Sequence, residues 1–392
     1  MKSRHLILLW SLALVLALAV FLVKRSQQKT SGSATQRAAG QTLFEEFPGD
    51  PISTIEIKGV NRTTTLVKSP DGWTVAERDG YPAKSAVANQ FLRTLADLKI
   101  TRALEAAPSL APRFGMDENA PKIAEHGITA TFKDSSGKQL AEITLGKNVD
   151  NGSKADPLTG NGGISGRFIR NSADSSGFYA VSELFSEISD LPTEWLAPGF
   201  FSLQKIKTIR VSQPGKTDPD WSVSRDDEDK PLALDSPAPG EAISPEKAKA
   251  LASLFAYPSF EDVVPASVTA ARGQPETTRR VTIETIEGFT YQITLTLAKP
   301  LPAAEGKLPK LSVFLTVDVS ATLPKERKKQ PNESAEEAKA KDHAFASRLA
   351  VLTAKLTGEQ KLHGHTYEID SAAVENLLIS RSELTSPDQR GK

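Results

Sequence analysis

The sequence predicts an α+β protein, in which an N-terminal transmembrane helix precedes a tandem duplication of modules that each combine an antiparallel sheet with a helix. Three observations carry this prediction. An uncharged apolar run opens the chain, short alternating segments separated by Gly- and Pro-containing turns follow it, and a set of strand and helix patterns recurs in the same order. The 392 residues allow two or three domains beyond an anchor.

The apolar run extends from Leu6 to Val23 without a charged residue. At a rise of about 1.5 Å per residue, this length is at the lower end of what spans a bilayer. We interpret residues 1–25 as a transmembrane anchor rather than a cleaved secretory signal, because Val20 to Val23 continue the run past its small residues. Residues 26–48 begin with a stretch rich in Ser, Gln, Thr and Gly, which predicts a flexible linker.

The charges beside the apolar run give two opposing indications of orientation. Four basic residues follow the run and two precede it, and this count favours a cytoplasmic main domain. A basic N-terminus followed directly by an apolar run instead favours export, and large domains cross the membrane largely regardless of flanking charge. We expect the main domain outside the cytoplasm.

The first module is predicted over residues 49–200. Ile55 and Ile57 alternate with polar neighbours as a half-buried strand, and further strands are expected at Thr63–Val67 and around Trp73. A helix is expected on the pattern Val87, Phe91, Leu95, and a hairpin from Ile128 to Leu145. A strand at Tyr179 and Val181 is expected to lead into a short helix over Leu184, Phe185 and Ile188.

The second module is predicted over residues 201–392 and repeats this order. Its strands are expected at Ile209 and around Trp221, which we take as the equivalent of Trp73. Ser244 and Pro245 predict the start of its helix. A hairpin around Gly288, a strand at Tyr367 and a short helix from Val374 to Ile379 complete it. A polar insertion near residues 324–343 predicts a solvated loop or a frayed helix, before apolar residues recur at helical spacing from Phe345.

Composition and motifs exclude several kinds of site. There is no Cys, which excludes thiolate nucleophiles and Cys-based metal sites, and 48 basic residues balance 48 acidic ones, so no net charge favours nucleic acid. Four local patterns are interpreted as structural: His363 with His365, Asp226 to Asp229, Ser244 with Lys247, and the glycines from Gly160 to Gly166. Trp73, Trp195, Trp221 and Tyr179 are interpreted as core anchors rather than as an aromatic ligand surface. No catalytic, cofactor-binding or metal-binding residue is therefore assigned.

A set of short motifs in the first module carries a resemblance to a known family. They are Trp73 and Val75; Tyr81 to Ala83; Phe114 to Met116 with Pro121; Leu145 and Gly146; Phe168 to Arg170; Tyr179 and Val181; and Trp195 and Leu196. With the apolar start, these motifs resemble the bacterial family called domain of unknown function 4340, over about residues 50–215.

The resemblance implies a membrane-anchored extracytoplasmic protein that occurs beside ABC-type transport components similar to those of gliding-motility systems. We therefore expect a single-pass protein of the bacterial inner membrane with its main domain in the periplasm. The resemblance carries over no catalytic residue. Gly115 and Gly146 are expected at turns that need positive φ, and Tyr81 and Phe114 are expected to pack under the helix.

Two functional hypotheses follow. The first is a non-enzymatic accessory or binding component of an envelope or ABC-type transport system, with the membrane contacted through Leu6 to Val23, ABC-type transporter subunits as partners, and no nucleic acid or small-molecule ligand identified. The alternative is an envelope hydrolase or glycan-binding enzyme with a site between the two modules. Asp150, Asp156 and Glu261 are the acidic candidates for that site.

Overall fold

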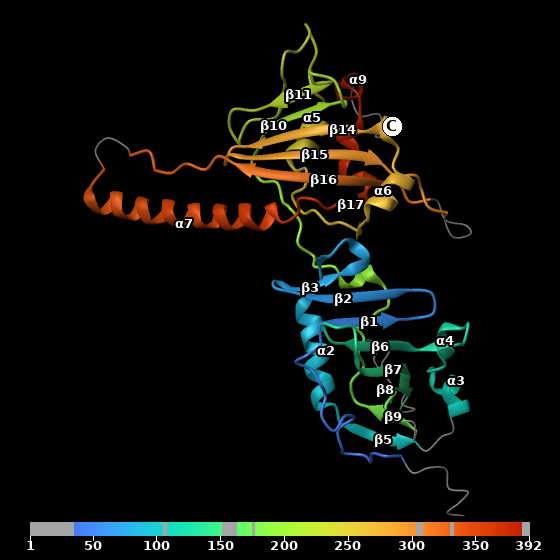
Figure 1. Cartoon of the computed structure of the whole chain (residues 1–392). Helices are drawn as coiled ribbons and strands as arrows, with labels where there is room; N and C mark the ends of the chain where they lie inside the picture. The colour runs from blue at the N-terminus through green and yellow to red at the C-terminus, as the bar shows by residue number, and fades with distance from the viewer. Residues whose placement is uncertain are drawn as a thin grey trace, which may run out of the picture. The chain divides into compact units, whose positions relative to one another are not determined.

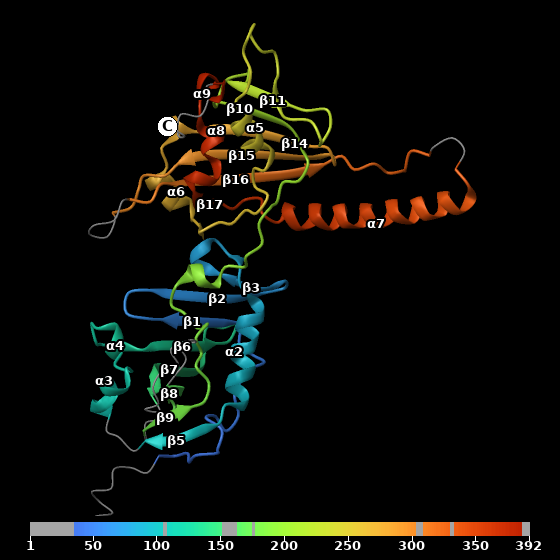
Figure 2. The same ribbon diagram turned by 180° about the vertical axis from the view of Figure 1, so that it is seen from behind.

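The computed structural model describes residues 35–104, 108–150, 163–174, 177–302, 309–329 and 333–385. These residues fall into two compact units, each built on one large antiparallel sheet (Figures 1 and 2). The first unit comprises the chain up to Ala76 together with Pro82–Trp195, and the second comprises Glu77–Tyr81 together with the chain from Leu196.

The sheet of the first unit has, within the described residues, nine strands in the order β4-β3-β2-β1-β6-β7-β8-β9-β5. Ile55 and Ile57 of β1 are fully buried while their neighbours are not, because successive side chains of a strand point to opposite faces. The strands are β1 Thr54–Lys58, β2 Thr63–Ser69, β3 Gly72–Val75, β4 Tyr81–Pro82, β5 Ile100–Leu104, β6 Ile128–Lys133, β7 Gln139–Asp150, β8 Ile164–Asn171 and β9 Phe178–Val181.

Helix α2 (Ser85–Asp97) forms the core of the first unit with one face of this sheet. Its buried residues Ala88, Phe91 and Leu95 recur at helical spacing. The ring of Phe91 lies 5.6 Å from that of Phe132 on β6. Two short helices, α3 (Ala111–Phe114) and α4 (Ile123–His126), connect β5 to β6.

The sheet of the second unit has eight strands in the described residues, in the order β12-β11-β10-β14-β15-β16-β17-β13. They are β10 Ile206–Ser212, β11 Trp221–Ser224, β12 Ala233–Leu234, β13 Asp262–Val263, β14 Arg279–Thr285, β15 Phe289–Leu297, β16 Ser312–Ala321 and β17 Tyr367–Asp370. The helices of this unit are α5 Pro245–Ala252, α6 Ala266–Arg272, α7 Ala335–Gln360, α8 Glu375–Leu378 and α9 Arg381–Thr385.

Apart from β4, the two sheets follow one strand plan. In each sheet the first three strands lie side by side in reverse chain order, and the last four strands follow them in chain order. The strand that comes after α2 in the first unit, or after α5 in the second, lies at the far edge of its sheet. Thus β1, β2 and β3 correspond to β10, β11 and β12, and α2 corresponds to α5. Helix α7 is inserted between β16 and β17, where the first unit passes from β8 to β9.

Helix α7 has a defined start inside the polar insertion. Ser334 and Glu337 form a reciprocal capping box, which satisfies backbone donors of the first turn. The helix then runs for 26 residues back towards the sheet, which its C-terminal end contacts (Figure 1). The second half of the predicted polar segment is therefore helical, and the cap explains why.

The predicted fold class needs correction. Two large antiparallel sheets dominate the described residues, and most helices are only four to eight residues long. No described helix combines the length and apolar character needed to span a membrane; even α7 carries charged residues along its length. These two predictions are corrected accordingly: the described residues give no support to the predicted N-terminal transmembrane helix or to the predicted single-pass inner-membrane location. The segment from Leu6 to Val23, on which both predictions depended, lies outside the described residues.

Two local predictions are also wrong. Trp73 lies on β3 and Trp221 on β11, so they occupy different strands of the shared plan, although both are buried. The segment from Leu184 to Ile188 is not a helix, because Phe185 has a φ of 52°, which a right-handed helix excludes.

Candidate functional site

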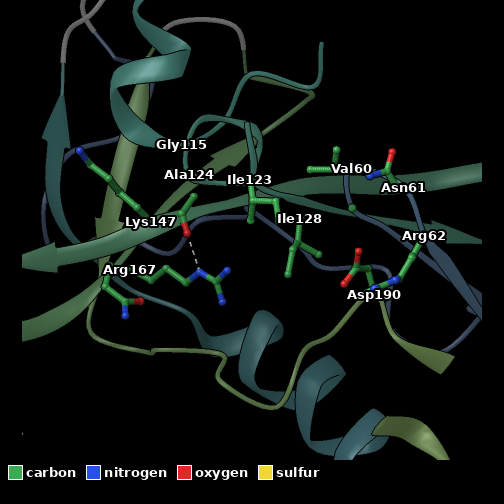
Figure 3. A pocket seen from close by; sticks show the side chains of 14 residues that line it. Val60, Asn61, Arg62, Gly115, Ile123, Ala124, Ile128, Lys147, Arg167 and Asp190 are labelled. Atoms are coloured by element: carbon green, nitrogen blue, oxygen red, sulfur yellow. Dashed lines mark hydrogen bonds between the residues drawn. The ribbon is translucent and has the colours of Figure 1, made fainter. Parts of the chain in front are cut away.

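A cleft of about 440 Å³ lies in the first unit, where two β-connections and the short helices meet (Figure 3). All of its lining residues belong to this unit. They are Gly59, Val60, Asn61 and Arg62 after β1; Gly115, Ile123, Ala124, Gly127 and Ile128 from α3 to β6; Gly146, Lys147 and Asn148 on β7; Arg167 on β8; and Asp190.

Glycines allow the backbone segments around the cleft to approach one another. Gly127 has a φ of 85°, and a Cβ there would lie 2.5 Å from the Gly115 carbonyl oxygen. A Cβ on Gly146 would lie 2.4 Å from the carbonyl oxygen of Phe114. Any larger residue would displace backbone at both positions, so the glycines define the wall of the cleft.

An irregularity in β7 shapes the same wall. The register between β7 and β8 shifts between Leu145 and Asn148, and β6 pairs with β7 only as far as Leu145. Gly146 and Lys147 therefore lie outside the regular ladder. The Gly146 carbonyl is left to accept a hydrogen bond from a side chain, as bulged residues often do next to binding sites.

That hydrogen bond comes from Arg167, which is held by three backbone carbonyls. Its Nε donates to Gly146 O at 2.7 Å, and its Nη1 donates to Leu184 O at 3.1 Å and Phe185 O at 3.2 Å. Burial lowers the pKa of Arg167, but a guanidinium stays charged in proteins. Within the described residues no carboxylate pairs with it, and its Nη2 has no hydrogen-bond partner.

Unlike Arg167, the other polar side chains of the cleft have no described partner. Asn61, Arg62, Lys147, Asn148 and Asp190 make no side-chain hydrogen bond or ion pair within the described part of the chain. Three cations thus face one carboxylate in the lining. In Figure 3 the Arg167 side chain extends towards the side that carries Asp190 and Arg62, whereas the Lys147 side chain points the other way.

This arrangement suits the binding of a charged group. A guanidinium fixed by neutral carbonyls keeps its charge and its geometry available to an anion. The lining contains a single carboxylate and, among the described residues, no imidazole or hydroxyl side chain. The charged and amide side chains of this lining can bind a ligand through hydrogen bonds and charge.

The acidic candidates for an enzyme site do not line this cleft. Asp150 ends β7 and is exposed, and Glu261, in the second unit, pairs with Lys310. Asp156 lies outside the described residues.

Two of the motifs interpreted as structural have individual explanations, and Gly160 and Gly162 lie outside the described residues. Ser244 is the N-cap residue of α5, but its hydroxyl donates to Glu246 at 2.7 Å instead of capping the backbone. His363 pairs with Asp318, and His365 packs against the ring of Tyr367. In the described ranges no three His, Asp or Glu side chains converge as metal ligands would.

Neither Arg167 nor Asp190 lies in a local motif, so the sequence did not identify them as functional candidates. The family resemblance did single out Gly115 and Gly146. Gly115 has the expected positive φ, of 66°. Gly146 does not; glycine is needed there because of the close Phe114 carbonyl.

Comparison with known proteins gives one match. A family model described as "Domain of unknown function (DUF4340)" matches residues 73–277, which is more than half of the chain. No curated protein and no solved structure matches the chain.

Proposed function

The chain belongs to the DUF4340 family, and we propose that it is a non-enzymatic binding component whose first unit takes a small ligand into the cleft around Arg167. The observation that carries this proposal is the preformed cleft with six polar side chains, of which only Arg167 has partners within the described residues. Concave sites with a few convergent polar groups are the usual places for small ligands.

The rigidity of the lining supports binding. Backbone segments pack closely at Gly127 and Gly146, where a Cβ would not fit, and Arg167 is held by three carbonyls. A site that is already ordered loses little conformational entropy when a ligand enters. A charge-assisted hydrogen bond to such a cation contributes about 1.5–3 kcal/mol.

We place this binding role in an envelope or ABC-type transport system, with transporter subunits as the partners. The support is the family resemblance. Affinity purification of the tagged full chain from its native cells in mild detergent tests this part. ABC-type subunits should co-purify with the chain, and recovery of the chain alone would contradict the partner assignment.

The ligand-binding part is tested with the purified full chain. Thermal unfolding is followed in the presence of a panel of neutral, cationic and anionic metabolites, for the wild type and for Arg167→Gln. At least one class should raise the melting temperature of the wild type and leave the variant unchanged. The proposal fails if no class shifts the wild type, or if every shift persists in the variant.

A further inference from the structure

We infer that the ligand of the cleft is a hydroxylated monocarboxylic acid, whose carboxylate binds Arg167 and whose hydroxyl groups donate to Asp190. This inference rests on the proposed function and specifies its ligand class. A uronic acid, a sugar that carries one carboxylate, represents this chemistry.

The charge of the cleft selects an anion. Arg62, Lys147 and Arg167 line it against Asp190 alone, in a chain whose formal net charge is zero. No described carboxylate neutralises any of the three cations. An anionic ligand would therefore replace water at cations that have no internal partner.

The geometry of Arg167 selects a carboxylate. Its Nε and Nη1 are already used by the carbonyls of Gly146, Leu184 and Phe185, which leaves the two N–H groups of Nη2. The two N–H groups of one amino group diverge, so Nη2 donates a single charge-assisted hydrogen bond to one carboxylate oxygen at a time. A phosphate prefers several converging donors. Lys147 points away from this side of the cleft, but Arg62 lies on it, so a phosphate is the competing ligand that the experiment must separate from the carboxylate (Figure 3).

Asp190 explains why hydroxyl groups are expected on the ligand. Its carboxylate lies against Gly59, where a Cβ would come within 2.0 Å of Oδ2. Glycine at position 59 therefore leaves space for this acceptor beside the cleft. An ionised carboxylate accepts hydrogen bonds only, so it favours hydroxyl donors and disfavours a dianion.

The remaining lining suits the C–H surface of such a ligand. Val60 and Ile128 are half-buried, and Ile123 is 82% exposed although it is a large apolar residue. A ligand that covered Ile123 would remove apolar surface from water. The volume of about 440 Å³ is within the range of small-molecule sites.

The experiment is calorimetric titration of the purified full chain with four probes: sodium glucuronate, glucose, acetate and glucose 6-phosphate. Glucuronate should bind at least tenfold more tightly than each of the others. Glucose lacks the anion, acetate lacks the hydroxyl groups, and glucose 6-phosphate presents a phosphate in place of the carboxylate.

Two variants assign the contacts. Arg167→Gln should weaken glucuronate at least tenfold, and Arg167→Lys, which keeps the charge but not the amino edge, should not restore it. Asp190→Asn should weaken glucuronate while leaving acetate unchanged or tighter, because it removes a negative charge. Arg93→Gln, at an exposed arginine of α2, is the matched control and should behave as wild type. Thermal unfolding of each variant verifies that it is folded. If the Arg167 variants are unfolded, Asp190→Asn alone tests the inference.

The outcomes separate the inference from the proposed function. Equal binding of glucuronate and acetate, or tighter binding of glucose 6-phosphate, overturns the ligand class while the cleft remains a binding site. Glucuronate binding that Asp190→Asn leaves unchanged overturns the hydroxyl contact. If none of the four probes binds, the ligand class is wrong, and the broader metabolite panel decides whether the proposed function fails with it.

Discussion

The carboxylate of Glu359, near the end of α7, accepts a hydrogen bond from the buried hydroxyl of Tyr291 on β15, with a distance of 2.8 Å between the two oxygens. Glu359 is 7% exposed and also accepts the Ser202 N–H at 3.0 Å. Lys355, one turn earlier, pairs with the same carboxylate. These contacts attach the base of the long helix to the sheet of the second unit.

We expect Glu359→Ala to destabilise the second unit by about 3 kcal/mol, because it leaves Tyr291, Ser202 N–H and Lys355 without their shared acceptor. Native-state hydrogen exchange of the β15 amides measures the change without assuming that the whole chain unfolds in one step. Glu336→Ala, at an exposed position of the first turn of α7, is the control and should change the same free energy by less than about 0.5 kcal/mol. Equal effects of the two substitutions would contradict the attachment.

Tyr291 should make the second unit sensitive to alkali. Burial, followed by the charge of Glu359, raises the pKa of Tyr291 above its ordinary value of 10. The stabilising contribution is therefore complete below pH 10, where the tyrosine is neutral in both states. It decreases above pH 10, because only the unfolded state releases the proton readily. Tyr291→Phe should remove this part of the loss of stability between pH 10 and 11, which urea unfolding measures. If the free energy of unfolding depends on pH in the same way in wild type and variant, Tyr291 is not the cause of the loss.

A second pH effect is expected at the C-terminal end of the described chain. Arg381 donates to both oxygens of Glu241, at 2.8 Å each, and these hydrogen bonds lower the pKa of Glu241 to about 2. The interaction is therefore complete above the ordinary pKa of 4.5 and is lost as the pH falls towards 2. Carboxyl carbon NMR should follow this titration, and Arg381→Gln should move the midpoint back towards 4.5. A midpoint that stays in place would show that the arginine is not its cause.

Gly127 allows a direct test of the cleft wall. Gly127 and Gly137 have nearly the same φ, 85° and 82°, but a Cβ on Gly127 meets two backbone oxygens and a Cβ on Gly137 meets nothing within 4 Å. Gly137→Ala should cost about 1–2 kcal/mol for the left-handed backbone alone. Gly127→Ala should cost roughly 1–3 kcal/mol more, because a Cβ is crowded there and because its ψ of 175° lies in a backbone region that glycine alone adopts freely. Hydrogen exchange of the β6 amides measures both, and equal costs would mean that the wall adapts.

The sequence predicts those parts of the fold that depend on local periodicity. The alternation of Ile55 and Ile57 indicates β1, and the spacing of Phe91 and Leu95 indicates α2, because each pattern reflects one buried face. The break at Phe185 has no such pattern, since its left-handed backbone is imposed by the surrounding contacts. The excess of sheet over helix also depends on how short segments pair across the unit, which no local window contains.

The candidate site was less predictable than the strands. Arg167 lies on β8 and Asp190 follows β9, and only the order of strands in the sheet and the irregularity at Gly146 bring them to one cleft. A lone arginine or aspartate outside any motif has the same appearance in a sequence as a solvated surface residue. Of the cleft residues, Gly115 and Gly146 had a sequence signal, which came from the family resemblance.

The central claim is that Arg167 holds the carboxylate of a ligand, and arginine side-chain NMR tests it most directly. The full chain is labelled with ¹⁵N-arginine, the Arg167 signals are assigned from their loss in Arg167→Gln, and sodium glucuronate is added. The account predicts that the Nη2 signals of Arg167 shift with saturation while those of Arg93 remain in place. Shifts that avoid Arg167, or that affect both arginines equally and without saturation, would contradict it.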